Sequence, residues 1–155
     1  KARYHYLLKP KEEGKTLSAQ LDFRLLPDQF GVISFEGVKF QYMTFSQAGT
    51  PVTGYRIGDL AYISDIREYT EDLLISLRGV KTLILSALRQ EPTRMHFCVK
   101  EALAFAHLVG AEKTYLTHIA HDLDHEAINA ELPSYVALGY DGLDIPFEIA
   151  PEHLV

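Results

Sequence analysis

The chain has 155 residues, of which 47% are hydrophobic and 23% are charged, and this balance is typical of one soluble globular domain. Its formal net charge of −6 argues against a non-specific nucleic-acid surface, which needs a basic patch. The single cysteine, Cys98, excludes an internal disulfide, and no apolar run is long enough to span a bilayer. We therefore expect a cytoplasmic protein that does not bind membranes.

The first half of the chain predicts strands joined by tight turns. Apolar or alternating runs are separated by Gly, Pro and Asp, which is typical of antiparallel strands. The predicted strands are residues 17–26, 30–35, 38–45, 52–57 and 60–64. Glu36-Gly37 and Gly58-Asp59 are hairpin signals between neighbouring strands. This half therefore predicts a β-meander.

The second half alternates between helix and strand patterns. The predicted helices are residues 69–77, 99–109 and 124–131, the predicted buried strands are residues 81–86 and 112–117, and residues 135–138 and 143–147 are expected to form a final hairpin. Gly79 and Gly110 end the first two helices, and residues 87–97 form a long loop. The fold class is α/β or α+β: a mixed sheet with flanking helices in a single domain, residues 1–155.

Polar residues follow three of the predicted strands. Asp65 comes after residues 60–64, His96 lies in the loop after residues 81–86, and His118 comes after residues 112–117. In open α/β sheets, ligands bind beyond the carboxyl ends of the strands, so these side chains and His121 are expected to converge. Two alternatives stay open, because Asp65 and His96 can also cap the helices that follow them.

The stretch TYLTHIAHDLDH, residues 114–125, holds three of the seven histidines. A buried strand that ends in imidazoles and carboxylates presents metal ligands, although the same residues also suit a polar loop. No GxSxG, GxxxxGK[ST] or GxGxxG motif is present. The remaining candidates for chemistry are carboxylate and imidazole groups. These are the ligands of Zn²⁺, Mn²⁺ or Fe, and such ions hydrolyse esters by activating bound water.

Several short motifs, in this order, resemble the metallo-β-lactamase superfamily. They are PVTGYR with AYISD (residues 51–65), MHF (95–97), LTHIAH (116–121) and YDG (140–142). The branch they resemble is phosphodiesterase-like and is related to cyclic phosphodiesterases of phosphonate metabolism and to tRNA 3′-processing endonucleases. The resemblance runs from about Phe30 to Phe147, and it implies an αββα sandwich with two divalent metal ions, zinc or manganese, at one edge.

The resemblance also implies roles for individual residues. Asp65 matches the bridging metal ligand, and His118 matches the last metal-binding histidine. His96 matches a catalytic histidine that contacts the substrate phosphate without binding metal. His121 and Asp122 continue the THxxHD pattern beside the ligands, and Asp141 of the YDG motif is structural or lies beside the ligands.

Two departures from the family pattern limit these expectations. The main ligand motif, HxHxDH, is absent from the chain, and Gln47 stands where the family has a histidine ligand. A glutamine amide is a poor ligand for a borderline cation. We therefore expect the chain to be the carboxyl-terminal part of a longer hydrolase, and to bind catalytic metals weakly or not at all when it is alone.

The expected activity is hydrolysis of a small phosphodiester, because an acidic chain disfavours a large nucleic acid. An alternative is a non-catalytic relative, a binding or scaffold protein in which Gln47 marks a degraded site. A homo-oligomer that covers the sheet left bare by the missing half is also expected.

Overall fold

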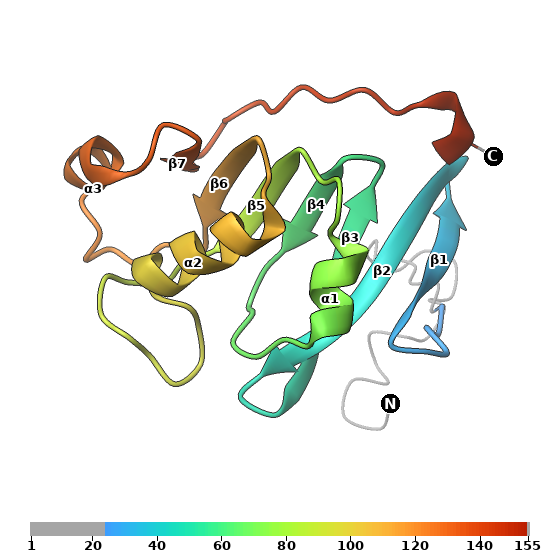
Figure 1. The fold of residues 1–155 in the computed structure, drawn as a ribbon, viewed down its shortest axis with the longest axis horizontal. Coiled ribbons are helices and arrows are strands. Elements are labelled where there is room, and N and C mark those ends of the chain that lie inside the picture. Colours follow the sequence, from blue (N-terminus) through green and yellow to red (C-terminus); the bar gives the residue numbers. More distant parts are fainter. Residues whose placement is uncertain (1–23, 155) are drawn as a thin grey trace, which may run out of the picture.

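A computed structural model describes residues 24–154. Its centre is one seven-stranded sheet in which the strands follow sequence order from β1 to β7 (Figure 1). The strands are β1 (Phe30–Phe35), β2 (Val38–Gln47), β3 (Thr50–Ile57), β4 (Leu60–Ile63), β5 (Thr82–Ser86), β6 (Lys113–Thr117) and β7 (Val136–Leu138). The helices are α1 (Glu71–Ser76), α2 (Val99–Val109), α3 (His125–Glu131) and the short η2 (Pro151–His153).

The sheet changes character at β4. Strands β1 to β4 pair antiparallel through tight turns, whereas β4 to β7 pair parallel. Each parallel step contains one helix, because a parallel connection must return the chain to the starting edge of the sheet. The predicted mixed sheet with flanking helices is therefore confirmed.

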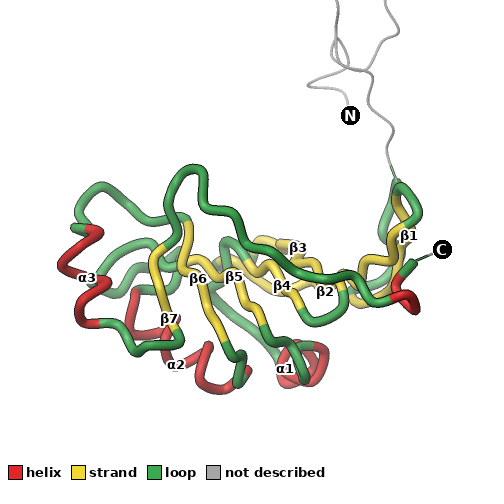
Figure 2. The backbone as a smooth tube through the Cα atoms, turned by 90° about the horizontal axis from the view of Figure 1, so that it is seen from above, coloured by secondary structure: helices red, strands yellow, loops and turns green. Residues whose placement is uncertain are grey.

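Helices α1 and α2 lie on the same face of the sheet (Figure 2). The core forms between them and the inward residues of the central strands, among them Leu83, Leu85 and Leu116, which are fully buried. In α2, Ala102, Phe105 and Ala106 form the buried stripe that the helical spacing predicts. No helix among residues 24–154 is long and apolar enough to cross a membrane.

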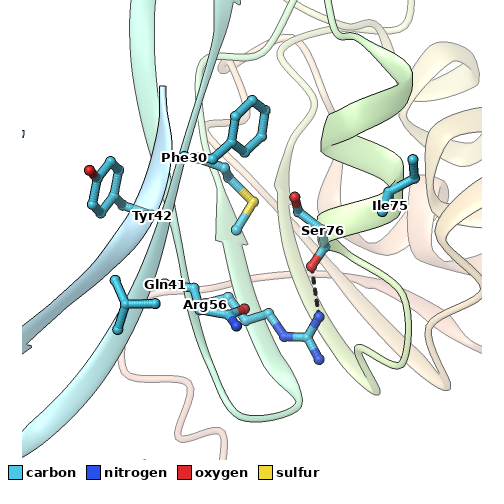
Figure 3. Close-up of a pocket in the computed structure, with 9 residues that line it drawn as sticks. Phe30, Gln41, Tyr42, Arg56, Ile75 and Ser76 are labelled. Atoms are coloured by element: carbon cyan, nitrogen blue, oxygen red, sulfur yellow. Dashed lines mark hydrogen bonds between the residues drawn. The ribbon is translucent and has the colours of Figure 1, made fainter. Parts of the chain in front are cut away.

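Arg56 of β3 connects the β-meander to α1 by a hydrogen bond to Ser76 (Figure 3). Its Nη1 donates to the carbonyl oxygens of Ser76, at 2.7 Å, and Arg78, at 2.9 Å. Its Nε donates to Gly58 O at 2.6 Å. The carbonyl groups at the end of a helix have no partner inside the helix, so one guanidinium supplies the missing donors.

The opposite face of the sheet carries apolar rows that neither α1 nor α2 covers (Figure 2). Alternation along the strands turns Tyr42, Tyr55, Tyr62, Ile84 and Tyr115 to this face, and strand register places them in one row across five strands. A groove of about 360 Å³ lies on the same face over β1 to β4 and is lined by Ile33, Phe40, Ile57 and Leu60 among others. We call these residues the aromatic face.

The expected final hairpin is wrong. Residues 136–138 do form β7, but it pairs parallel with β6, and residues 143–147 form no strand. Helix α3 returns the chain before β7, which makes β7 parallel, and Pro146 lacks the N–H that a ladder needs. The segment after β7 instead runs along the sheet to β2, where Val38 bridges Leu154 (Figure 1).

Other boundaries shift by only a few residues. The helix expected at 69–77 is Glu71–Ser76, and the helix expected at 99–109 has those bounds. Most of the strand expected at 17–26 lies outside the described residues.

Candidate active site

Three side chains named from the sequence converge at one edge of the sheet. Asp65 Oδ1 lies 3.4 Å from His96 Nδ1 and 3.3 Å from His118 Nε2. One ligand atom from each of the three residues lies within 4.8 Å of the others. The two imidazole rings are 4.8 Å apart between centroids. One carboxylate oxygen of Asp65 is therefore the common neighbour of both imidazole rings, although Asp65 and His118 are 53 positions apart in the sequence.

Asp65 and His118 reach the site from equivalent places in the fold. Each lies at the carboxyl end of a parallel strand, Asp65 shortly after β4 and His118 directly after β6. Both have left-handed backbone conformations, with φ of 59° and 57°. Such conformations cost about 1–3 kcal/mol in residues other than glycine and are concentrated at functional sites.

The two capping alternatives are excluded by the helix boundaries. The N-cap of α1 is Thr70, five residues after Asp65, and the N-cap of α2 is Cys98, two residues after His96. Asp65 and His96 therefore cap neither helix, and their side chains remain available to the site.

His96 belongs to the loop between β5 and α2, and its side chain is only 14% exposed. Partial burial holds the pKa of His96 below its usual value, and the nearby His118 adds to this effect, whereas Asp65 opposes it. The ring is therefore neutral at neutral pH. A neutral imidazole has one nitrogen that can accept or bind a cation and one N–H that can donate.

Gln47 ends β2 beside the same ring. Its Nε2 lies 3.3 Å from Nδ1 and 3.3 Å from Nε2 of His96. Because it is equally far from both nitrogens, the amide spans the edge of the ring and does not point along one lone pair. Gln47, the position at which the resemblance predicts a histidine ligand, therefore contacts His96.

The other residues named from the sequence lie around this group. Asp122 Oδ1 lies 3.7 Å from Arg89 Nε, and His121 is exposed; neither is among the three grouped ligands. Asp141 is exposed and lines, together with His118, a cavity of about 560 Å³ on the aromatic face. His125 lines the same cavity, and its ring packs edge-on against Tyr140, with centroids 6.2 Å apart.

Contacts that support His96 were missed by sequence reasoning. Thr93 and Arg67 hydrogen-bond its backbone, and Arg67 also binds both carboxylate oxygens of Glu101. One local signal was available: Glu101 stands three residues after the N-cap Cys98, which is the spacing of a capping box.

The donor set fits a divalent cation. Two atoms bound to one tetrahedral ion at about 2.1 Å stand about 3.4 Å apart. Asp65 Oδ1 keeps that spacing to both His96 Nδ1 and His118 Nε2. One carboxylate oxygen and two imidazole nitrogens are also the chemistry that zinc and manganese bind.

Comparison with known proteins identifies the family of the chain. Residues 9–119 match the model of the beta-lactamase superfamily domain. A solved diphosphatase of the PhnP family is 36% identical, with a TM-score of 0.74 over 76% of this chain and 47% of that one. The metallo-beta-lactamase fold protein YhfI from Bacillus subtilis is 17% identical, with a TM-score of 0.66 over 92% of this chain and 59% of that one.

One curated relative is named for a different activity. An octanoyltransferase of Porphyromonas gingivalis is 26% identical over 99 residues, which are 61% of this chain and 20% of that protein. The chain thus spans about half the length of the solved structures it matches and a smaller share of this relative. The family model covers more than half of the chain. The chain therefore belongs to the beta-lactamase superfamily.

Proposed function

We propose that the intact protein is a metal-dependent hydrolase that cleaves a phosphodiester or a diphosphate bond in a small substrate, and that these residues supply one side of its active site. The observation that carries the proposal is the position of Asp65 Oδ1, 3.4 Å from His96 Nδ1 and 3.3 Å from His118 Nε2. A carboxylate beside two imidazoles at the carboxyl edge of parallel strands is a metal-ligand arrangement at the place where α/β sheets bind substrates.

The roles follow from the position of each group. Asp65 and His118 would hold divalent ions, because their ligand atoms face each other from two strand ends. Such ions supply a hydroxide nucleophile at neutral pH by lowering the pKa of bound water to about 7. His96 is neutral and its side chain is 14% exposed, so in place of binding an ion its ring N–H could donate to a phosphoryl oxygen that lies against Asp65 and His118.

The name of one similar protein supports the substrate class. The PhnP-family structure is described as a diphosphatase, and it is 36% identical over most of this chain. Diphosphates and phosphodiesters share a tetrahedral phosphorus with a leaving oxygen, so the same groups can serve both reactions. The net charge of −6 favours a small substrate over a long nucleic acid.

The test is turnover of bis(p-nitrophenyl) phosphate and of a nucleoside diphosphate by the intact protein with Mn²⁺ or Zn²⁺. Asp65→Asn keeps the shape of the side chain but removes the charge, and it should lower kcat/KM by about 100-fold or more. The matched control is Asp72→Asn, an exposed aspartate on α1, which should leave turnover unchanged. If no divalent ion supports turnover of either substrate, the protein is not a hydrolase of this class.

A second candidate function is a non-catalytic binding or scaffold protein. The contact between Gln47 and His96 favours it, because an amide replaces a ligand at the position where the family uses histidine. This candidate predicts a folded protein that is inactive with every divalent ion, and whose partners still bind after Asp65→Asn.

A further inference from the structure

The three grouped residues are not equally constrained by the sheet. Asp65 and His118 adjoin strands, but His96 lies in a segment of about a dozen residues between β5 and α2. Loops are more mobile than the elements they connect, whereas a functional side chain must hold its geometry within about 0.5 Å. Something in the fold must therefore fix this loop.

Thr93 closes the loop onto His96. The Thr93 hydroxyl accepts a hydrogen bond from His96 N at 3.0 Å and donates one to His96 O at 2.8 Å. Both polar groups of the His96 backbone are thus bound to a single side chain three residues earlier. This fixes the direction in which the imidazole leaves the backbone.

Arg67 links the loop to the segment that carries Asp65. It lies two residues after Asp65, and its Nη1 donates to His96 O at 3.4 Å and to both Glu101 carboxylate oxygens at 2.8 Å. Beside it, Phe97 N donates to Ile66 O at 3.3 Å. The segments of Asp65 and His96 are therefore bound to each other through side chain and backbone.

Glu101 anchors Arg67 to a rigid element. It stands in the first turn of α2, and its Oε2 accepts a hydrogen bond from Cys98 N at 2.9 Å. Its side chain is 33% exposed and that of Arg67 is 25% exposed. One nitrogen of Arg67, Nη1, thus contacts both carboxylate oxygens of Glu101 and the carbonyl oxygen of His96.

We propose that Arg67, Thr93 and Glu101 are positioning residues that hold the His96 imidazole at a fixed place beside Asp65 and His118. Their hydrogen bonds link α2 to the loop that carries His96 and to the segment after β4. None of the three is among the grouped ligand atoms, so they act through His96. Their effect on turnover rests on the proposed function, whereas their effect on the His96 ring does not.

The first readout is the mobility of the histidine rings, measured by NMR relaxation in protein labelled with ¹³C at histidine Cε1. The His96 signal is assigned by its loss in His96→Asn. Thr93→Val removes the hydroxyl at nearly constant shape, and Arg67→Met removes the guanidinium. Both should make the His96 ring more mobile while the His118 signal stays unchanged. Thr93→Ser, which keeps the hydroxyl, should restore the wild-type signal.

The second readout is kinetic. In the intact protein, Thr93→Val and Arg67→Met should lower kcat by about 10-fold to 100-fold with little change in KM. Arg78→Ala, at an exposed arginine after α1, is the matched control. An unchanged His96 ring signal in folded Thr93→Val and Arg67→Met variants overturns the inference. If the wild type has no turnover, the proposed function fails. The His96 ring signal then still decides whether these residues hold the imidazole in place.

Discussion

Asp65 and His118 have the same left-handed backbone conformation at the ends of β4 and β6, the two strands that flank β5, with φ of 59° and 57°. Their side chains face each other from these two ends, with 3.3 Å between Asp65 Oδ1 and His118 Nε2. The sharp turn after each strand directs the ligand toward its partner. Both grouped residues at the strand ends therefore have a backbone conformation that is costly for a side chain other than glycine.

The strain at His118 has a measurable consequence. His118→Gly and His118→Ala both remove the imidazole, but only glycine adopts φ of 57° without a steric cost. We predict that the glycine variant is more stable than the alanine variant by about 1 kcal/mol in urea denaturation. Equal stability of the two would mean that the left-handed turn is not strained. Both variants should lose metal affinity alike.

Replacing Gln47 with histidine should add an imidazole ligand to the group of Asp65, His96 and His118. Its amide already contacts His96, so an imidazole in its place lies beside the grouped ligands. We predict that Gln47→His tightens zinc binding by the intact protein by about 10-fold or more, measured by competition with a chromophoric chelator. Gln41→His, at an exposed position on the same strand, is the control. Unchanged affinity in Gln47→His would show that this position does not limit the site.

The isolated 155-residue chain is predicted to bind metal weakly, because it offers three grouped ligands at most among its described residues. Titration calorimetry with Zn²⁺ and Mn²⁺ measures this. A Kd below about 1 μM for one ion per chain would contradict the prediction. In that case Asp65, His96 and His118 would form a sufficient site by themselves.

Much of the fold follows from local patterns, and most of the support for the site does not. The continuous apolar runs of β5 and β6 and the stripe of α2 are specified by nearby residues, so their bounds were predicted closely. The orientation of β7 depends on where α3 returns the chain. The alternation of apolar and polar residues at 143–147 carries no information about that. The contact of Arg67 with Glu101 joins residues 34 positions apart, and only folding brings them together.

Acid should destabilise the protein partly through His96. Its pKa is lowered in the folded state, chiefly by burial, so the unfolded chain binds more protons over the range just below the usual histidine value of about 6.5. The stability contributed by the neutral ring is therefore present above that value and is lost as pH falls. Urea denaturation at about pH 7.5 and about pH 5.5 should show a smaller loss for His96→Asn than for the wild type. An equal loss would assign the acid sensitivity to other groups.

The contacts of Arg56 predict a stability effect far from the site. Arg56→Met keeps much of the apolar stem but removes three hydrogen bonds to carbonyl oxygens, including those of Ser76 and Arg78. Each bond from a charged donor contributes about 1.5 kcal/mol or more, and partial exposure reduces the sum, so a net loss of about 2 kcal/mol is expected. Arg78→Ala removes an exposed arginine at the same helix end and should cost less than about 0.5 kcal/mol.

The aromatic face should drive association of the isolated chain. Its groove of about 360 Å³ is lined mainly by apolar side chains of β1 to β4, and two of them, Tyr55 and Tyr62, are 38% and 43% exposed. We predict that sedimentation velocity finds the 155-residue chain as a dimer, with the aromatic faces of two copies in contact. Tyr62→Lys should dissociate it, because a charge buried between two apolar faces is costly. Leu108→Lys, at a 58% exposed position on α2, changes an apolar residue outside this face and should leave the dimer intact. A monomeric wild-type chain would show that this surface does not associate with itself, and dissociation by both variants would place the interface elsewhere.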